Sequence, residues 1–222
     1  MPVLIGAILV LQGVAAATPT VAQVEAAPPA RAGELVLAGK EHDEIASVAQ
    51  VKQPGPNPPG LVELDLVEAA RRQGHACVRR RWRAKFRHDP GEAAGAARLD
   101  DAYAGWEVAL PGSGGCAAAS FAHLNPGTSV ETAVTALKAL RRIVARPAGV
   151  EIVCSSSLDP ALCADKRTTI ARIAAAPAWL ISGESGAVRL LLGARGQAPI
   201  GVELDGVRPG RITVSQEAPA PF

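Results

Sequence analysis

The stretch from residue 77 to 88, "CVRRRWRAKFRH", restricts the fold more than any other, because cations and apolar side chains alternate along it. Counted in twos, one face holds Val78, Trp82 and Phe86. These three residues are also four apart, so a helix is the competing interpretation, but its apolar stripe would be only one residue wide. The alternation favours a strand with one buried face and one charged face. The charged face, called the basic row below, consists of Arg79, Arg81, Arg83, Lys85 and Arg87.

Further strands are predicted on both sides of a central helix. Residues 103–112, "YAGWEVALPG", alternate in the same way, with Trp106, Val108 and Leu110 facing inward. Glu107 would face outward between them. The segment "CAAASFAHL" predicts a third strand beside this one. Later segments add "VEIVC", "AWLIS", "AVRLLLG", "IGVELDG" and "RITVS", and hairpin-like turns join the last four.

The clearest helix is predicted for residues 125–149. Thr128 and Glu131 have the spacing of a capping box, cations fill the last turns, and Pro147 ends the segment. This helix is expected to pack on the sheet. Its apolar stripe consists of Val130, Val134, Leu137, Ile143 and Val144.

Two weaker patterns predict further helices. Residues 61–74, "LVELDLVEAARRQG", carry acids early, arginines late and Gly74 as a stop, which are the preferences of a helix dipole. A shorter helix is expected to begin near Asp159. Together the elements predict an α+β fold, in which a mainly antiparallel sheet packs against two to three helices and disulfides add stability.

The N-terminal part of the chain is expected to lie outside the folded domain. Residues 1–22 contain an apolar run and then small residues, with Ala17 or Ala22 before the cut, which is the plan of a secretory signal peptide. No Lys or Arg precedes the run, and an uncleaved run would act as a short membrane anchor. Residues 23–60 contain two proline-rich patches and predict a flexible linker with at most one edge strand. Residues 61–222 would form a single domain that is periplasmic or secreted.

The four cysteines are expected to form disulfides, because an exported chain enters an oxidising compartment. Four cysteines allow three pairings. The favoured pairing joins Cys154 to Cys163 across the polar turn "CSSSLDPALC" and leaves Cys77 with Cys116. His75 lies near Cys77 but lacks the paired spacing of a zinc site, so no metal site is predicted.

The basic row is the first candidate site. Residues 71–88 hold eight Lys or Arg and no acid, whereas the whole chain holds 23 basic and 21 acidic residues. Such a row suits phosphate, because Arg can bind phosphate through two hydrogen bonds at once. The expected partner is an anionic lipid, an envelope glycan or another protein, and export disfavours nucleic acid. The competing interpretation is a solvated sheet face that acids on neighbouring strands offset.

The second candidate site is the segment "ISGESGAVRLLLGARGQAPIGVELDG" at 181–206. Its Gly-Glu-Ser-Gly, followed by a strand and "IGVE", resembles the nucleophile region of trypsin-like serine proteases. The resemblance implies Ser185 as the nucleophile, nearby backbone amides as an oxyanion hole, and His123 as the best available base. A glycine and serine turn between strands also explains the segment, and Ser185 is expected not to be a nucleophile. The chain lacks a "TAAHC" segment and departs from the family pattern at Glu184, Ala187 and Val188.

The sequence therefore predicts an exported, non-enzymatic protein that binds an anionic envelope component or a protein partner through the basic row. A divergent serine hydrolase is the alternative function. No cofactor and no metal are expected, because the sequence contains no nucleotide-binding loop, zinc-binding helix motif or calcium-loop pattern.

Overall fold

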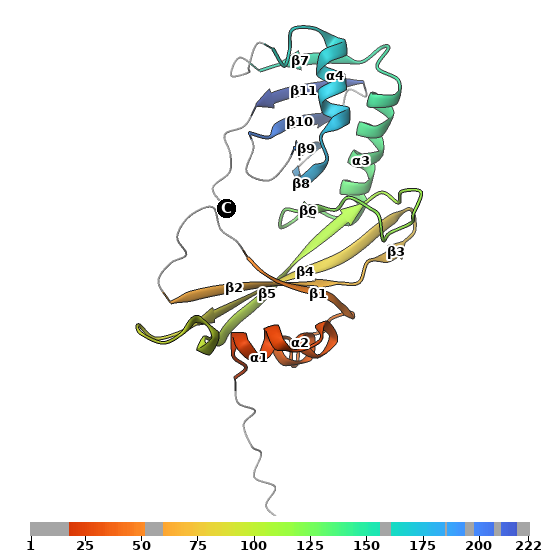
Figure 1. Cartoon of the computed structure of the whole chain (residues 1–222). Coiled ribbons are helices and arrows are strands. Elements are labelled where there is room, and N and C mark those ends of the chain that lie inside the picture. Colours follow the sequence, from red (N-terminus) through yellow and green to blue (C-terminus); the bar gives the residue numbers. More distant parts are fainter. Residues whose placement is uncertain are drawn as a thin grey trace, which may run out of the picture.

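The computed structural model contains a twisted sheet of eleven strands with helices packed against it (Figure 1). It describes residues 18–51, 60–155, 161–184, 186–193, 198–206 and 210–216. The strands are β1 (Ile45–Gln50), β2 (Leu61–Glu68), β3 (Arg71–Gln73), β4 (Ala76–Arg87), β5 (Arg98–Ala109), β6 (Ala122–Leu124), β7 (Glu151–Cys154), β8 (Ala178–Glu184), β9 (Ala187–Leu192), β10 (Ile200–Asp205) and β11 (Arg211–Gln216). The helices are α1 (Val21–Ala26), α2 (Pro29–Val36), α3 (Val130–Ala145), α4 (Lys166–Ala175) and the short 3₁₀ helix η1 (Ala94–Ala96).

The strand order is β1-β2-β4-β5-β6-β8-β9-β10-β11-β7, and β3 pairs with β4 beside this path. Neighbouring strands are antiparallel except for two parallel pairs, β6 with β8 and β7 with β11. The α+β class expected from the sequence agrees with this mostly antiparallel sheet. The described residues form four α-helices, however, where two to three were expected.

Two hydrophobic clusters hold the helices on the sheet. In the first cluster, Ala136 and Ile143 of α3 and Ile170 of α4 pack on the strands from β4 to β11. In the second cluster, Val24 of α1 and Val36 of α2 pack on β2, β4 and β5. Figure 1 shows the two helix pairs at different places along the sheet, with α1 and α2 beneath β2, β4 and β5.

Strand β4 confirms the alternation predicted for residues 77–88. Trp82 and Phe86 are buried in the second cluster, and Val78 is buried in the first. Because side chains alternate along a strand, these three residues share one face of β4, and the basic row lies on the opposite face. Both hydrophobic clusters therefore lie on the same face of β4.

Residues 61–74 form strands β2 and β3, so the helix predicted there is wrong. Leu64 and Leu66 alternate with Glu63 and Asp65, and all four are buried. In the pairing of β2 with β4, the leucines lie opposite apolar residues, while the acids lie opposite members of the basic row. The alternation was the stronger signal, because cross-strand pairing overrides a weak helix propensity.

In the segment 23–60, predicted as a flexible linker with at most one edge strand, β1 is such an edge strand, but the helices α1 and α2 were not expected. The Thr20 hydroxyl caps α1, and Pro29 begins α2 at a position where proline loses no helical hydrogen bond. Both helices and β1 bury apolar side chains in the second cluster. Residues 1–17 and 52–59 lie outside the described residues. In the part of the chain that is described, no helix is long and apolar enough to cross a membrane.

Helix α3 confirms the helix predicted within residues 125–149, with two differences. Ser129, not Thr128, is the N-cap, and its hydroxyl accepts a hydrogen bond from the Thr132 N–H over 3.0 Å. The Thr128 hydroxyl instead accepts one from the Gly183 N–H of β8 over 2.9 Å. All residues of the predicted stripe pack in or against the first cluster, but only Ile143 of them is buried rather than partly buried; the other buried residues of α3 are Ala133, Ala136 and Leu140.

In β5, one side chain is more exposed than expected and one is more buried. Val108 is buried as expected, and Trp106 shares its face, yet Trp106 is 37% exposed. The reason is its position opposite Arg80, between the two hydrophobic clusters. Glu107 lies on the outward face as predicted, opposite Arg79, but it is 2% exposed because the side chains of Arg79 and Arg81 pair with it.

Candidate anion-binding surfaces

Three arginines of the basic row pair with acids on the neighbouring strands. Arg79 Nε donates to Glu107 Oε2 over 2.6 Å, and Arg81 Nε donates to Glu107 Oε1 over 2.8 Å. Arg81 Nη1 also donates to Asp65 Oδ2, and Arg83 Nε donates to Asp65 Oδ1, each over 3.1 Å. Acids of β2 and β5 thus lie between the arginines of β4 and neutralise them.

The other two cations of the basic row are also engaged. Lys85 Nζ lies 5.1 Å from the ring centroid of Tyr103, which is a cation–π contact. Arg87 Nε donates to Asp100 Oδ2 over 2.6 Å in an exposed ion pair. An incoming phosphate would therefore compete with protein groups at every position of the row.

Glu107 is the most buried acid that contacts the basic row, with 2% of its side chain exposed. Burial alone would raise its pKa, but Arg81, His123 and Arg79 outweigh burial, and the pKa of Glu107 lies below its usual value. Burial alone would lower the pKa of Arg81, but Glu107 and Asp65 outweigh it and raise that pKa. Both groups are therefore charged at neutral pH.

Of the two residues in the protease-like resemblance, only His123 is described. His123 Nε2 lies 3.2 Å from Glu107 Oε1, and the backbone of His123 is in register with Leu180 of β8. Ser185 lies outside the described residues. A catalytic histidine must lie within hydrogen-bond reach of its nucleophile, so the expectation that Ser185 is not a nucleophile stays a prediction.

Glu68 lies between the two hydrophobic clusters and binds residues there through its carboxylate. Its buried carboxylate accepts hydrogen bonds from Trp82 Nε1 over 2.9 Å, Arg80 Nε over 3.1 Å and the Asp43 N–H over 3.1 Å. Burial alone would raise the pKa of Glu68, but these hydrogen bonds outweigh burial and lower it. The Arg80 guanidinium also lies 5.5 Å from the ring centroids of both Trp82 and Trp106. These contacts explain how the apolar face of β4 accommodates a cation.

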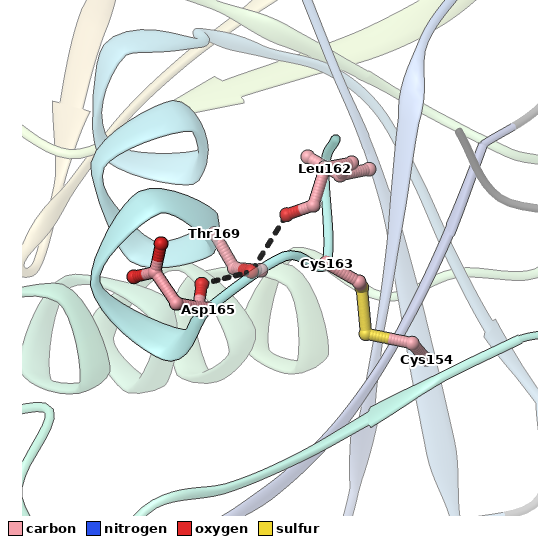
Figure 2. Close-up of a disulfide and its surroundings, with 5 residues drawn as sticks. All are labelled: Cys154, Leu162, Cys163, Asp165 and Thr169. Atoms are coloured by element: carbon pink, nitrogen blue, oxygen red, sulfur yellow. Dashed lines mark hydrogen bonds between the residues drawn. A yellow bond between two sulfur atoms is a disulfide. The ribbon is translucent and has the colours of Figure 1, made fainter. Parts of the chain in front are cut away.

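The two disulfides have the pairing that the sequence favoured. Cys77 of β4 is bonded to Cys116 in the loop after β5. Cys154, at the end of β7, is bonded to Cys163, just before α4 (Figure 2). Asp159, where a helix was expected to begin, lies outside the described residues in the loop that this second disulfide closes.

Hydrogen bonds fix the segment between Cys163 and α4. The Asp165 carboxylate caps the helix by accepting a hydrogen bond from the Thr168 N–H over 2.8 Å. Thr169 Oγ1 lies 2.7 Å from the Leu162 carbonyl oxygen and 3.0 Å from that of Asp165, as Figure 2 shows. Together with the disulfide, these contacts attach the edge strand β7 to the start of α4.

A second basic surface lines a groove of 980 Å³ between the β3–β4 hairpin and the C-terminal half of α3. It is called the basic groove below. None of its lining side chains is acidic. The basic ones are Arg72, His75, Lys138, Arg141, Arg142 and Arg146. The others are Leu110, Pro111, Ile143, Ala145 and Val150.

The cations of the basic groove have no carboxylate partner among the residues that the structure describes. Arg72 Nε donates to the Gly74 carbonyl oxygen over 3.3 Å, and Arg142 Nε donates to the Lys138 carbonyl oxygen over 3.4 Å. These two contacts are to backbone groups and leave the positive charge uncompensated. All six basic side chains are exposed, so an anion can reach them.

Sequence reasoning missed the basic groove because its walls come from two distant segments. The cations of α3 were accounted for as favourable neighbours of a helix C-terminus. Arg72 and His75 lie about sixty residues earlier in the chain, at the end of a segment whose pattern indicated a helix. One signal was available: Lys138, Arg142 and Arg146 are spaced by four, which places three cations on one helix face.

A smaller groove of 520 Å³ adjoins the basic groove along α3. The two share Arg142 and Ile143. The smaller groove is also lined by Glu131, Asp205 and Arg211, so it contains charges of both signs. A mixed lining gives an anion no net attraction, and the basic groove is therefore the stronger candidate site.

The chain matches no protein-family model, no curated protein and no solved structure. Its candidate function therefore rests on the geometry of its own surfaces. Across the described ranges, no group of three or more His, Cys, Asp or Glu side chains is placed to hold a metal ion.

Proposed function

We propose that this protein is exported and binds an anionic component of the cell envelope without catalysing a reaction. The observation that carries the proposal is the basic groove, whose six basic side chains face no acidic one among the described residues. Unpaired cations in a concave site focus their electric field and attract a ligand of opposite charge. The basic row supports the proposal less, because acids of β2 and β5 already pair with its arginines.

Binding to defined anionic and neutral materials tests this function. The anionic set is inorganic polyphosphate, polygalacturonate and phosphatidylglycerol vesicles, and the neutral set is dextran and phosphatidylcholine vesicles. Isothermal titration calorimetry should detect binding to at least one anionic material and to no neutral one, with affinity falling steeply as salt is added. The proposal fails if no anionic material binds at low salt.

Matched variants connect the binding to the groove. The groove variant, Arg141→Gln with Arg146→Gln, should bind at least about tenfold more weakly, because each charge-assisted hydrogen bond contributes strongly to affinity. The control variant, Arg98→Gln with Arg167→Gln, removes the same charge at exposed positions outside the groove. It should bind like the unmodified protein. Equal losses in both variants would show that net charge, and not the groove, attracts the ligand.

The fold also indicates where the exported chain would begin. Val21 is 2% exposed in the second cluster, and its N–H donates to the Ala97 carbonyl oxygen over 2.9 Å. Removal of residues 1–22 would delete these contacts, so we expect the signal peptide to be cut after Ala17. Mass spectrometry of the exported protein should find Thr18 at its N-terminus. An intact N-terminus, or a cut after residue 22, would contradict this expectation.

The alternative hydrolase function has a direct test. A fluorophosphonate probe should not label the protein, because the segment around Ser185 departs from the protease pattern at Glu184, Ala187 and Val188 and the chain has no "TAAHC" segment. Labelling that Ser185→Ala abolishes would establish the alternative and overturn the non-enzymatic proposal.

A further inference from the structure

We infer that the ligand of the basic groove is a linear phosphate-bearing chain that lies along the groove, an inference that rests on the function proposed above. Its basic side chains lie on two walls. The β3–β4 hairpin supplies Arg72 and His75, and α3 with its C-cap residue Arg146 supplies the four others. A ligand between these walls would meet positive charge on both sides.

The cations on the helix wall are regularly spaced. Lys138, Arg142 and Arg146 are four residues apart, which places them on one face of α3. At a rise of about 1.5 Å per residue, neighbouring Cα atoms are about 6 Å apart, and the three extend over about 12 Å. One compact anion contacts one or two of these side chains. A chain with repeated charges contacts all three.

The chemistry of the wall favours phosphate over carboxylate chains. Three of the four helix cations are arginines, and the guanidinium group binds a phosphate through two parallel hydrogen bonds. Each phosphate along a chain offers several acceptor oxygens, so one phosphate can be shared by neighbouring arginines. Lys138 would add a single charged donor at one end of the row.

Stabilisation of the helix accounts for Arg141, Arg142 and Arg146 at the C-terminal end of α3, but not for the other basic residues of the groove. The helix dipole favours positive charge only near the last turn. Lys138 lies seven residues before the end of α3 at Ala145, and Arg72 and His75 belong to another element. No carboxylate among the described residues pairs with any of the five Lys and Arg side chains. Their common feature is that they line one groove.

The shape of the groove argues against a flat membrane surface. The groove is open to solvent, and its volume of 980 Å³ leaves room for a chain between the two walls. A flat surface would touch only the rims of the two walls, whereas an inserted chain contacts both. Ile143 and Val150, at 9% and 8% exposure, are apolar lining residues that offer no acid to compete for the cations.

The lining also disfavours single-stranded nucleic acid. Proteins that bind it stack successive bases on aromatic rings. No Trp, Tyr or Phe is among the residues that line the groove. The exposed rings of Trp106 and Tyr103 lie outside it and contact Arg71 and Lys85 respectively. A phosphate chain without bases fits the lining better.

A length series tests the inference on the full chain. The probes are orthophosphate, tripolyphosphate, long-chain inorganic polyphosphate and an oligomer of glycerol phosphate, each titrated calorimetrically at low salt. Affinity should rise at least about tenfold from orthophosphate to the long chain, since each added charged contact multiplies the binding constant. The glycerol phosphate oligomer distinguishes a phosphodiester source from a polyphosphate source, and tight binding of either supports the inference.

Variants with substitutions on each wall of the groove test where the phosphate chain binds. In the groove variant, affinity should rise little with the length of the phosphate chain, while the weak affinity for orthophosphate should remain. The control variant should behave like the unmodified protein. Arg72→Gln, on the opposite wall, should weaken long-chain binding by about tenfold if the chain lies between the walls. A long chain that binds Arg72→Gln unchanged would overturn the two-walled geometry.

Other outcomes separate this inference from the proposed function. Equal affinity for orthophosphate and the long chain would mean a single-anion site. Binding of phosphatidylglycerol vesicles without binding of soluble phosphate chains would mean a membrane surface. Tighter binding of a single-stranded oligonucleotide of equal charge would mean base recognition. Each result overturns the linear-chain inference, whereas failure of every anionic material overturns the proposed function as well.

Discussion

The basic row and the basic groove each contain five Lys and Arg side chains, but the groups that surround these side chains differ. On β4, Glu107 alone accepts hydrogen bonds from both Arg79 and Arg81. In the groove, no described carboxylate approaches a cation, and the side chains stand exposed on two walls. Charge density in a sequence therefore does not identify an anion site; the decisive property is whether acids elsewhere in the fold neutralise the cations.

Burial separates the roles of the two regions. In the row, Arg79, Arg81 and Arg83 are about a quarter exposed and Glu107 is 2% exposed, so water compensates little of their charge. Removal of one partner would leave the other charged and poorly solvated, which strongly destabilises a folded protein. The exposed cations of the groove keep their hydration when they are unpaired. We therefore expect the row to contribute to stability and the groove to contribute to binding.

The largest expected effect is that of Glu107→Gln, which removes the acid shared by two arginines. It should lower the free energy of unfolding by about 3 kcal/mol, because both guanidinium groups lose a charged partner. Urea denaturation of this variant measures the effect. Glu25→Gln, at an exposed position of α1, is the matched control and should change stability by less than about 0.5 kcal/mol. Equal free energies of unfolding for the two variants would contradict the claim that the basic row contributes to stability.

The second prediction compares one arginine from each region. Arg81→Gln should lower the free energy of unfolding by about 2 kcal/mol, since Glu107 and Asp65 each lose a donor. Arg141→Gln should stay within about 0.5 kcal/mol of the unmodified protein. In binding assays the order should reverse, with Arg141→Gln the weaker binder. If Arg81→Gln abolishes polyphosphate binding at unchanged stability, the roles of the two regions are exchanged.

The smallest predicted effect is a pH dependence. The folded-state pKa values of Glu107 and Glu68 are lowered, so their contribution is present above the unfolded pKa of about 4.3 and is lost as pH falls through the folded values. The free energy of unfolding should fall below about pH 4.3 by up to about 1.4 kcal/mol per pH unit for each group. Glu107→Gln should show a shallower acid slope, and the groove variant an unchanged one. Thermal unfolding across a pH series measures both slopes.

The sequence predicted those elements whose signal lies within one segment. The alternation of Val78, Trp82 and Phe86 located β4, and the short spacing of Cys154 and Cys163 located a disulfide. The strands after α4 also formed where the glycine-containing turns placed them.

Features that depend on distant contacts were not predicted. The sequence of β2 resembled a helix, because acids followed by arginines suit a helix dipole. The role of Glu63 and Asp65 depends instead on the pairing of β2 with β4, which places them opposite cations of the basic row. The prolines within residues 23–60 suggested a linker, although one of them, Pro29, begins α2. The basic groove forms only because Arg72 and Arg142, far apart in the sequence, line the same cavity. No local sequence pattern predicts that arrangement.

Strand β7 pairs with β11, a strand that lies far along the chain from it. Glu151 pairs in parallel with Arg211, in the final strand of the sheet, whereas Cys163 lies only nine residues beyond Cys154. Contacts between distant parts of a chain form slowly, because the intervening loop must close before they stabilise anything. The disulfide between Cys154 and Cys163 closes a much shorter loop than the pairing of β7 with β11 does. The edge strand β7 is therefore held by one local covalent link to the segment before α4 and by one distant pairing, and loss of the disulfide would leave only the distant one.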